Sequence, residues 1–198
     1  QSVQIIIIRY CRRIASTITL QRLKIIDTTM KKIGIFYGST TGNTETVAKT
    51  IAEKLGLADG DVHEVSELNA DAVAAYDVLL LGSSTWGAGD LQDDWYDGVD
   101  VLKGLDLSGK QVAFFGCGDS ASYPDTFCGA LGDIYNDIQG TGASFIGMVA
   151  TDGYTFDESA SVVDGKFVGL AIDEDNESDK TEERINAWVE QLKGEMGA

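Results

Sequence analysis

The sequence predicts an α/β fold with a doubly wound, five-stranded parallel sheet and helices on both of its faces. From residue 33 onward, short apolar runs alternate with segments of helical periodicity, and this alternation is typical of parallel sheets. The run at 78–82 is a continuous apolar stretch, as expected for a strand buried on both faces. The length of 198 residues and the hydrophobic fraction of 43% suit one globular domain.

Each expected element is placed by its local pattern. The strands are expected at residues 33–38, 61–65, 78–82, 111–116 and, for a fifth strand, from 144–149 onward. The helices are expected at residues 43–56, 70–76, 91–102, 125–140 and 181–193, the first with Gly56 as its C-cap. Residues 147–169 break the alternation, because they contain turn residues and two short β-like stretches. We therefore expect an insertion within the fifth strand, which resumes at 167–172.

The first 29 residues differ in composition from the rest of the chain. They carry five basic side chains and one acidic side chain, whereas residues 30–198 carry 10 basic and 31 acidic side chains, a net charge of −21. Their apolar run at 3–8 is too short to span a bilayer, and the arginines that follow argue against a secretory signal. We expect a non-native or disordered extension before a true start at Met30, or alternatively an organellar transit peptide. The folded domain is expected at residues 30–198.

The charge and the cysteine count limit the partners and the compartment. An acidic domain repels nucleic acids and anionic membranes, and it attracts proteins with basic patches; simple solubility is the alternative explanation. Three cysteines without metal-site spacing favour a reducing compartment, so we expect a cytoplasmic protein, or one of an organelle stroma if the extension is a transit peptide. A single histidine excludes a His-rich metal site, and no metal is expected.

A hydroxyl-rich loop follows the first expected strand. Ligands of doubly wound sheets bind beyond the carboxyl ends of the strands, so this loop is a candidate site. It offers hydroxyl and backbone N–H donors at the start of a helix, which favours an anion. Its spacing is not that of a Walker A loop and no lysine follows, so a terminal monophosphate fits better than a triphosphate. The alternative is an ordinary N-cap at Thr41 or Asn43. The candidate residues are Ser39, Thr40, Thr41, Gly42, Asn43 and Thr44.

Two further loops place an aromatic residue at the same edge of the sheet. Trp86 lies in a loop with several glycines after the third strand, and Tyr123 lies in a polar loop after the fourth strand. Each alone could be a core or surface aromatic, but together with the phosphate loop they predict a planar ring with a phosphate tail as ligand. The candidate residues of these loops are Ser84, Thr85, Trp86, Gly87, Cys117, Gly118, Asp119, Tyr123 and Asp125.

Taken together, these motifs resemble the flavodoxin family of long-chain type. Residues 39–44 resemble its phosphate loop, residues 85–87 the loop whose Trp stacks on the inner flavin face, and residues 118–125 the loop whose Tyr covers the outer face. The stretch 165–176 is similar to long-chain members, which carry an insertion in the fifth strand. Two positions depart from the pattern. Cys117 stands where many members have Thr, and Gly87 stands where a larger residue often follows the Trp.

The resemblance implies the flavodoxin-like strand order 2-1-3-4-5 and non-covalent binding of FMN. It implies a low-potential one-electron carrier, a monomer that serves redox enzymes with basic docking patches, such as a flavodoxin/ferredoxin–NADP reductase. Backbone groups of Cys117, Gly118 and Asp119 would bind the pyrimidine edge of the ring, and Asp152 would approach from the insertion. The acidic residues beside the Trp86 loop would form the docking face: Asp90, Asp93 and Asp94.

Two other functions are considered. An FMN-dependent quinone or nitro reductase would need a substrate pocket beside the flavin, whereas Trp86 and Tyr123 are expected to cover both ring faces. A phospho-acceptor receiver domain would need an Asp at the end of the third strand, where this chain has Gly82, so that function is rejected. The sequence thus favours an electron carrier, with the flavin reductase as the alternative.

Overall fold

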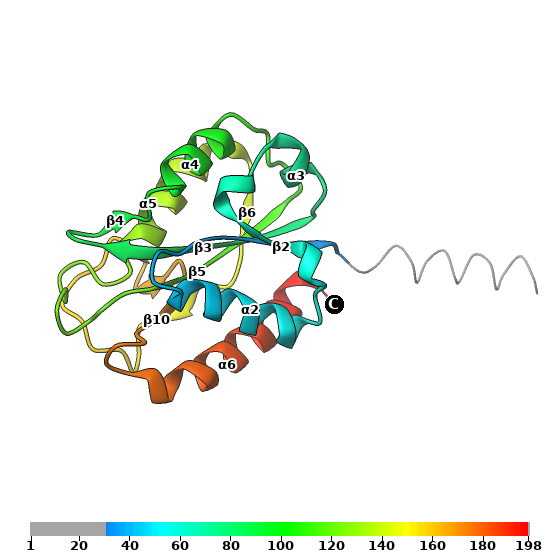
Figure 1. The fold of residues 1–198 in the computed structure, drawn as a ribbon. Helices are drawn as coiled ribbons and strands as arrows, with labels where there is room; N and C mark the ends of the chain where they lie inside the picture. The colour runs from blue at the N-terminus through cyan, green and yellow to red at the C-terminus, as the bar shows by residue number, and fades with distance from the viewer. Residues whose placement is uncertain (1–30, 198) are drawn as a thin grey trace, which may run out of the picture. The chain divides into compact units, whose positions relative to one another are not determined.

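A parallel sheet forms the centre of the computed structural model, which describes residues 31–197 (Figure 1). Its five main strands follow the order β10-β5-β3-β1-β2, which confirms the predicted doubly wound order. Every pairing along this path is parallel. The strands are β1 (Ile33–Gly38), β2 (Val62–Glu64), β3 (Val78–Trp86), β5 (Gln111–Cys117) and β10 (Gly169–Ile172). The extension expected at residues 1–29 and the start at Met30 lie outside the described residues.

The fifth strand is interrupted, as the sequence predicts. β6 (Ser144–Phe145) pairs with the beginning of β5, and β10 pairs with its end. Three short strands between them form a separate antiparallel sheet in the order β7-β9-β8. These are β7 (Val149–Ala150), β8 (Val162–Val163) and β9 (Lys166–Phe167).

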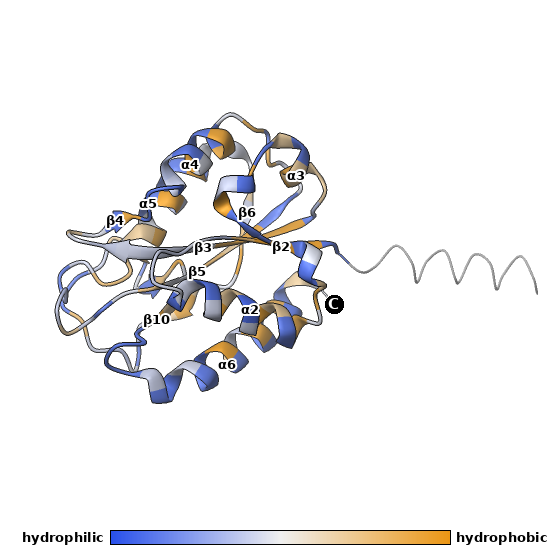
Figure 2. Cartoon of the chain, in the orientation of Figure 1, coloured by the Kyte–Doolittle hydropathy of each residue, from blue (hydrophilic) through white to orange (hydrophobic). Residues whose placement is uncertain are grey.

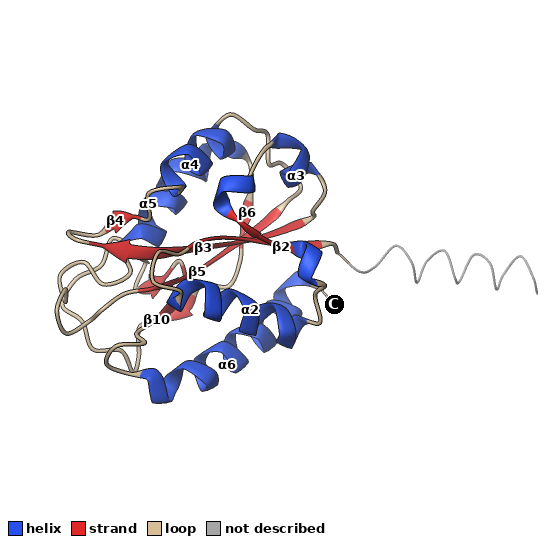
Figure 3. Cartoon of the chain, viewed as in Figure 1, coloured by secondary structure: helices blue, strands red, loops and turns tan. Residues whose placement is uncertain are grey.

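Helices cover both faces of the main sheet. Figures 1 and 3 show α3, α4 and α5 on one face and α2 and α6 on the other. Gly56 follows α2 with a φ of 70°, which confirms the expected C-cap. The helices are α2 (Asn43–Leu55), α3 (Ala70–Ala74), α4 (Trp95–Lys103), α5 (Gly129–Ile138) and α6 (Ser178–Met196). Single 3-10 turns lie at η1 (Asp59–Asp61), η2 (Val65–Glu67) and η3 (Gln139–Thr141).

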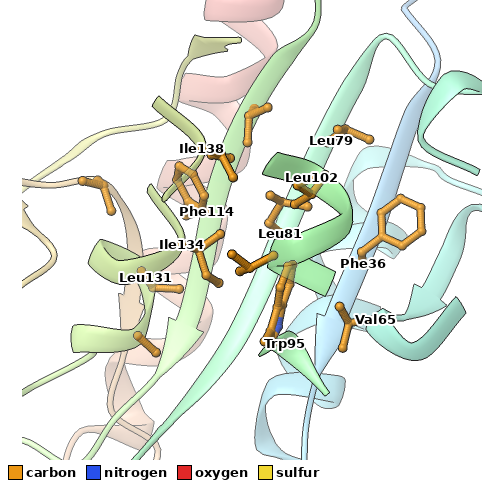
Figure 4. Packing of buried hydrophobic residues seen from close by; sticks show 14 of the residues in the cluster. Phe36, Val65, Leu79, Leu81, Trp95, Leu102, Phe114, Leu131, Ile134 and Ile138 are labelled. Carbon is orange, nitrogen blue, oxygen red and sulfur yellow. The ribbon is translucent and has the colours of Figure 1, made fainter. Parts of the chain in front are cut away.

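A hydrophobic core lies on each side of the sheet. On the side of α4 and α5, Trp95 and Phe114 belong to one cluster (Figure 4). On the side of α2 and α6, Phe115 and Trp188 belong to the other cluster. Successive side chains of a strand point to opposite faces, so β5 supplies both cores. Figure 2 shows hydrophilic and hydrophobic patches alternating along α4 and α6, as one-sided burial requires.

Two helices begin later than the sequence predicts. Leu91 belongs to β4 (Asp90–Leu91), an antiparallel partner of β3, and α4 begins at Trp95. The helix expected from residue 125 begins at Gly129, because Phe127 and Cys128 turn into the core. Cys128 has a φ of 52°, and this left-handed conformation interrupts a helix.

The third strand is longer than the sequence predicts. It continues past residue 82 to Trp86, because Ser83 and Ser84 pair with Gly116 and Cys117 of β5. A Cβ at residue 116 would lie 2.3 Å from the Ser83 carbonyl oxygen, so only glycine permits this approach. The extended strand carries Trp86 to the edge of the sheet where the candidate loops lie.

Candidate functional site

A cleft of about 340 Å³ lies at the carboxyl ends of β1, β3 and β5. This is the edge where the strand order reverses and where ligands of doubly wound sheets bind. Loops after four strands contribute to it. The lining residues are Thr41, Asn43, Ser84, Thr85, Trp86, Gly87, Cys117, Gly118, Asp119, Tyr123, Glu174 and Asp175.

The loop between β1 and α2 leaves the start of the helix uncapped by side chains. Gly42 is the N-cap residue, with a φ of 93° and no side-chain capping hydrogen bond. The Gly42 N–H donates to Ser39 Oγ at 3.2 Å, which shapes the loop itself. The ordinary capping role considered for Thr41 or Asn43 is therefore not observed. The first N–H groups of an α-helix have no partner within the helix, so this end of α2 suits an anion.

Two threonine hydroxyls at this edge have no hydrogen-bond partner within the described residues. They are Oγ1 of Thr44, which is fully buried in the first turn of α2, and Oγ1 of Thr85, near the end of β3. An unpaired buried hydroxyl costs about 1–3 kcal/mol in proteins. Both can donate a hydrogen bond to an added oxygen atom, and none of the residues that line the cleft is basic. This set of neutral donors fits a mononucleotide such as FMN.

Trp86 and Tyr123 line the cleft and remain exposed. Their exposed fractions are 42% and 51%, whereas the other two tryptophans, Trp95 and Trp188, are buried in the two cores. Trp86 Nε1 donates to Ser84 Oγ at 3.0 Å, which fixes the indole relative to its strand. Two exposed aromatic rings from different loops can cover the faces of a planar ligand.

Acidic and neutral groups set the electrostatics of the cleft. Burial raises the pKa of the Cys117 thiol to about 12. The neighbouring Thr44 side chain acts in the opposite direction, and the carboxylates of Glu174 and Asp175 act in the same direction as burial. The thiol is therefore protonated and neutral at physiological pH. Hydrogen bonds from Ser122 hold the pKa of Asp119 below its ordinary value, so this carboxylate stays charged.

Most of the predicted site residues come together at this edge. Ten of them line the cleft, and Ser39, Thr40, Gly42 and Thr44 lie in the loop or first helical turn next to it. Asp125 instead lines a separate hollow, and Asp152 is not among the residues that line the cleft.

Sequence reasoning did not assign Glu174 and Asp175 to the site, although both line the cleft. The signal was present in the chain, since these residues follow the fifth strand at the edge where the other strands place their loops.

Other kinds of site were also sought in residues 31–197. No group of three or more His, Cys, Asp or Glu side chains in this part of the chain could hold a metal ion. No helix described for the same residues is both long enough and apolar enough to cross a membrane.

The fold and the cleft define an α/β protein with a ligand site at the switch point of a doubly wound sheet. The model of the flavodoxin family matches residues 35–188. The chain is 45% identical over 167 residues to a flavodoxin of Nostoc, covering 84% of this chain and 98% of that protein. It is 46% identical over 164 residues to flavodoxin 1 of Escherichia coli, covering 82% and 93% of the two chains. The chain belongs to the flavodoxin family.

A solved structure supports the same assignment. The structure of Fusobacterium nucleatum flavodoxin bound to flavin mononucleotide aligns with a TM-score of 0.76 at 30% identity. The alignment covers 84% of this chain and 99% of that one.

Proposed function

We propose that the cleft holds FMN and that the protein is a low-potential one-electron carrier between redox enzymes, not a stand-alone enzyme. The observation that carries the proposal is the position of Trp86 and Tyr123, two exposed aromatics that line one cleft beside an uncapped helix start. The similarity to flavodoxins, one of them solved with flavin mononucleotide, supports the same ligand.

The loop between β1 and α2 would hold the phosphate. Its hydroxyls and the first N–H groups of α2 supply neutral donors, and the helix dipole favours negative charge there. The buried Thr44 hydroxyl, which has no partner among the described residues, would gain a phosphate oxygen as acceptor. The residues proposed for this end are Ser39, Thr40, Thr41, Gly42, Asn43 and Thr44.

The loops after β3 and β5 would hold the ring. Trp86 and Tyr123 would cover its two faces and keep water from them, while backbone groups of Cys117, Gly118 and Asp119 would bind its polar edge. Ser84, Thr85 and Gly87 complete this end of the cleft. A direct role for Asp125 and Asp152 stays a prediction.

The carboxylates around the cleft favour a low reduction potential. FMN supplies the redox centre when it is bound, taking up and releasing electrons. Asp119, Glu174 and Asp175 line the cleft, and their negative charges oppose the addition of negative charge to a ring beside them. The neutral Cys117 thiol does not offset this field.

Partners would dock on the acidic surface beside the Trp86 loop. Asp90, Asp93 and Asp94 are all exposed there. We propose redox enzymes with basic patches as partners, and a monomer that acts in the cytoplasm. Because such attraction is screened by salt, electron transfer should slow as ionic strength rises.

Reconstitution with flavin tests the proposal. The purified full chain should bind FMN with the absorbance of a bound flavin, accept electrons in a reductive titration and pass them to a partner protein. Steady oxidation of NAD(P)H with a quinone or nitro compound, without an added reductase, would instead support the flavin reductase. A colourless protein that does not bind FMN would overturn the proposal.

A further inference from the structure

A buried carboxylate lies next to the loops of the cleft, and the proposed function gives it no role. Asp173 follows β10 and is 0% exposed. A buried charge is unfavourable unless hydrogen bonds satisfy it, so the partners of this side chain indicate what it does.

The hydrogen bonds of Asp173 join two loops that line the cleft. Its Oδ2 accepts from the backbone N–H of Ser120 at 3.0 Å and from the Ser120 hydroxyl. Its Oδ1 accepts from the backbone N–H of Asn176 at 3.0 Å, and Asn176 Nδ2 lies 3.0 Å from both carboxylate oxygens. The carboxylate therefore connects the loop after β5 with the loop after β10.

The same network continues to Tyr123. Asn176 Nδ2 also donates to Asp119 Oδ1 at 2.9 Å, and that oxygen accepts from the N–H groups of Ala121 and Ser122. The Tyr123 N–H then donates to the Asp119 carbonyl oxygen at 3.0 Å. The backbone that carries the exposed tyrosine is thus held by a continuous set of hydrogen bonds that begins at Asp173.

The next residue along the chain is held from a different side. The Pro124 carbonyl oxygen accepts from the N–H groups of Asp157 and Glu158, at 2.9 and 3.0 Å, which belong to the insertion. Loss of the Asp173 network should therefore loosen residues 119–123 while Pro124 stays in place.

We propose that Asp173 is a positioning residue for the flavin ring: its carboxylate fixes the Tyr123 loop against the loop of Glu174 and Asp175. The proposal rests on the proposed function, because it requires a ring for Tyr123 to cover. In this arrangement the outer wall of the cleft is built before the ligand arrives, and the ligand does not have to order it.

The test compares two variants with the same change of charge. Asp173→Asn weakens the network, whereas Asp179→Asn removes the charge of an exposed carboxylate in the first turn of α6 that does not line the cleft. The full chain is studied with and without flavin, using FMN and riboflavin as probes. The measurements are the dissociation constants, the visible circular dichroism of the bound flavin and the exchange of the amide hydrogens at 119–123.

For Asp173→Asn we expect binding of FMN and riboflavin to weaken by a similar factor, about tenfold, because several hydrogen bonds to a charged group are lost. The circular dichroism of the bound flavin should change, and the amides at 119–123 should exchange faster in the flavin-free chain. Asp179→Asn should leave this exchange and the dichroism as in the wild type.

Two results would overturn the inference. One is an Asp173→Asn protein with lower thermal stability but wild-type dissociation constants and dichroism, which would show a general structural role. If that variant does not fold, Ser120→Ala replaces it in the test, since it keeps the carboxylate and removes one donor. The second result that would overturn the inference is a Ser120→Ala protein with wild-type amide exchange and wild-type flavin binding. Failure of the wild type to bind either flavin would instead reject the proposed function, while the exchange measurement would still report on the network.

Discussion

The two loops that frame the ends of the cleft are built in opposite ways. In the loop between β1 and α2, Ser39 Oγ accepts from the Gly42 N–H and Thr46 Oγ1 donates to the Gly42 carbonyl oxygen, while Thr44 Oγ1 has no hydrogen-bond partner among the described residues. In the loop between β5 and α5, Ser120 donates hydrogen bonds to Asp173 and Asp119 accepts one from Asn176. Both polar residues of this loop therefore bond to the loop after β10. One loop keeps its donors available, and the other satisfies its polar groups internally.

The difference separates two ways of binding one ligand. Donors without partners gain hydrogen bonds only when an acceptor arrives, so they contribute to affinity for the phosphate at some cost in stability of the flavin-free protein. A loop that is already fixed contributes by presenting an aromatic ring in position, which lowers the ordering cost of binding. Variants in the two loops should therefore differ in their effects on FMN, on riboflavin and on the flavin-free protein.

The largest effect is expected for Thr44→Val, which replaces the buried hydroxyl by a methyl group of similar shape. Binding of FMN should weaken by about 1.5–3 kcal/mol, the value of a hydrogen bond to a charged group, and binding of riboflavin should not change. The flavin-free protein should lose no stability and gain at most about 1 kcal/mol, because the hydroxyl has no partner in the fold beyond a weak contact with the Cys117 thiol. Fluorescence titration and urea unfolding measure the two effects.

The matched control for this change is Thr50→Val, in the same helix but with a hydroxyl that bonds the Thr46 carbonyl oxygen. It should not alter the ratio of FMN to riboflavin affinity. Wild-type FMN affinity in Thr44→Val would contradict the assignment of the phosphate loop.

The next effect concerns the backbone of the same loop. Gly42→Ala should destabilise the protein by about 1–2 kcal/mol, the cost of a left-handed conformation for a residue with a Cβ. The φ of 93° is the cause, since no atom lies within 4 Å of the added Cβ. Gly60→Ala is the control, because its added Cβ also meets no atom and its φ is not positive. Equal unfolding free energies for the two variants would show that the loop adapts without strain.

A smaller effect is expected for the aromatic wall. Tyr123→Leu should weaken FMN and riboflavin alike by about 0.5–1.5 kcal/mol, the range for an aromatic pair beyond its buried area. Tyr96→Leu is a matched control, because Tyr96 is 54% exposed against 51% for Tyr123 but does not line the cleft. Quenching of flavin fluorescence should decrease only in the Tyr123 variant. An equal loss of flavin affinity in both variants would contradict stacking of Tyr123 on the ring.

The smallest effect is the response of the Tyr123 loop to acid. Hydrogen bonds from Ser122 lower the pKa of Asp119 in the folded protein, so its stabilisation is fully present above the unfolded pKa of about 3.9. This contribution is lost as the pH falls through the folded pKa. Because the group is near the surface and screened by solvent, it should amount to less than about 1 kcal/mol.

Urea unfolding of the wild type and of Asp119→Asn, from neutral pH down to about pH 3, measures this contribution. The difference in unfolding free energy should be largest at neutral pH and should shrink in acid. A difference that stays constant with pH would show that the charge of Asp119 does not stabilise the loop.

The sequence determined the order of the elements and the insertion, and it predicted most of the residues that line the cleft. Strands and helices were predicted because their hydrophobic periods of 2 and 3.6 residues are local properties of the chain. The loops carrying Trp86 and Tyr123 were found because parallel strands bring their carboxyl ends to one edge, so adjacency in space follows from topology.

The tertiary structure decided what depends on contacts between distant residues. Leu91 and Phe127 fit a helical pattern, yet pairing with β3 and burial in the core place them outside the helices. The hydrogen bond between Ser120 and Asp173 joins positions that are 53 residues apart, and no local sequence pattern predicts it. Local periodicity determines which segments become strands or helices. The ends of these segments and the hydrogen bonds between loops depend on packing between residues that are far apart in the sequence, and this packing exists only in the folded chain.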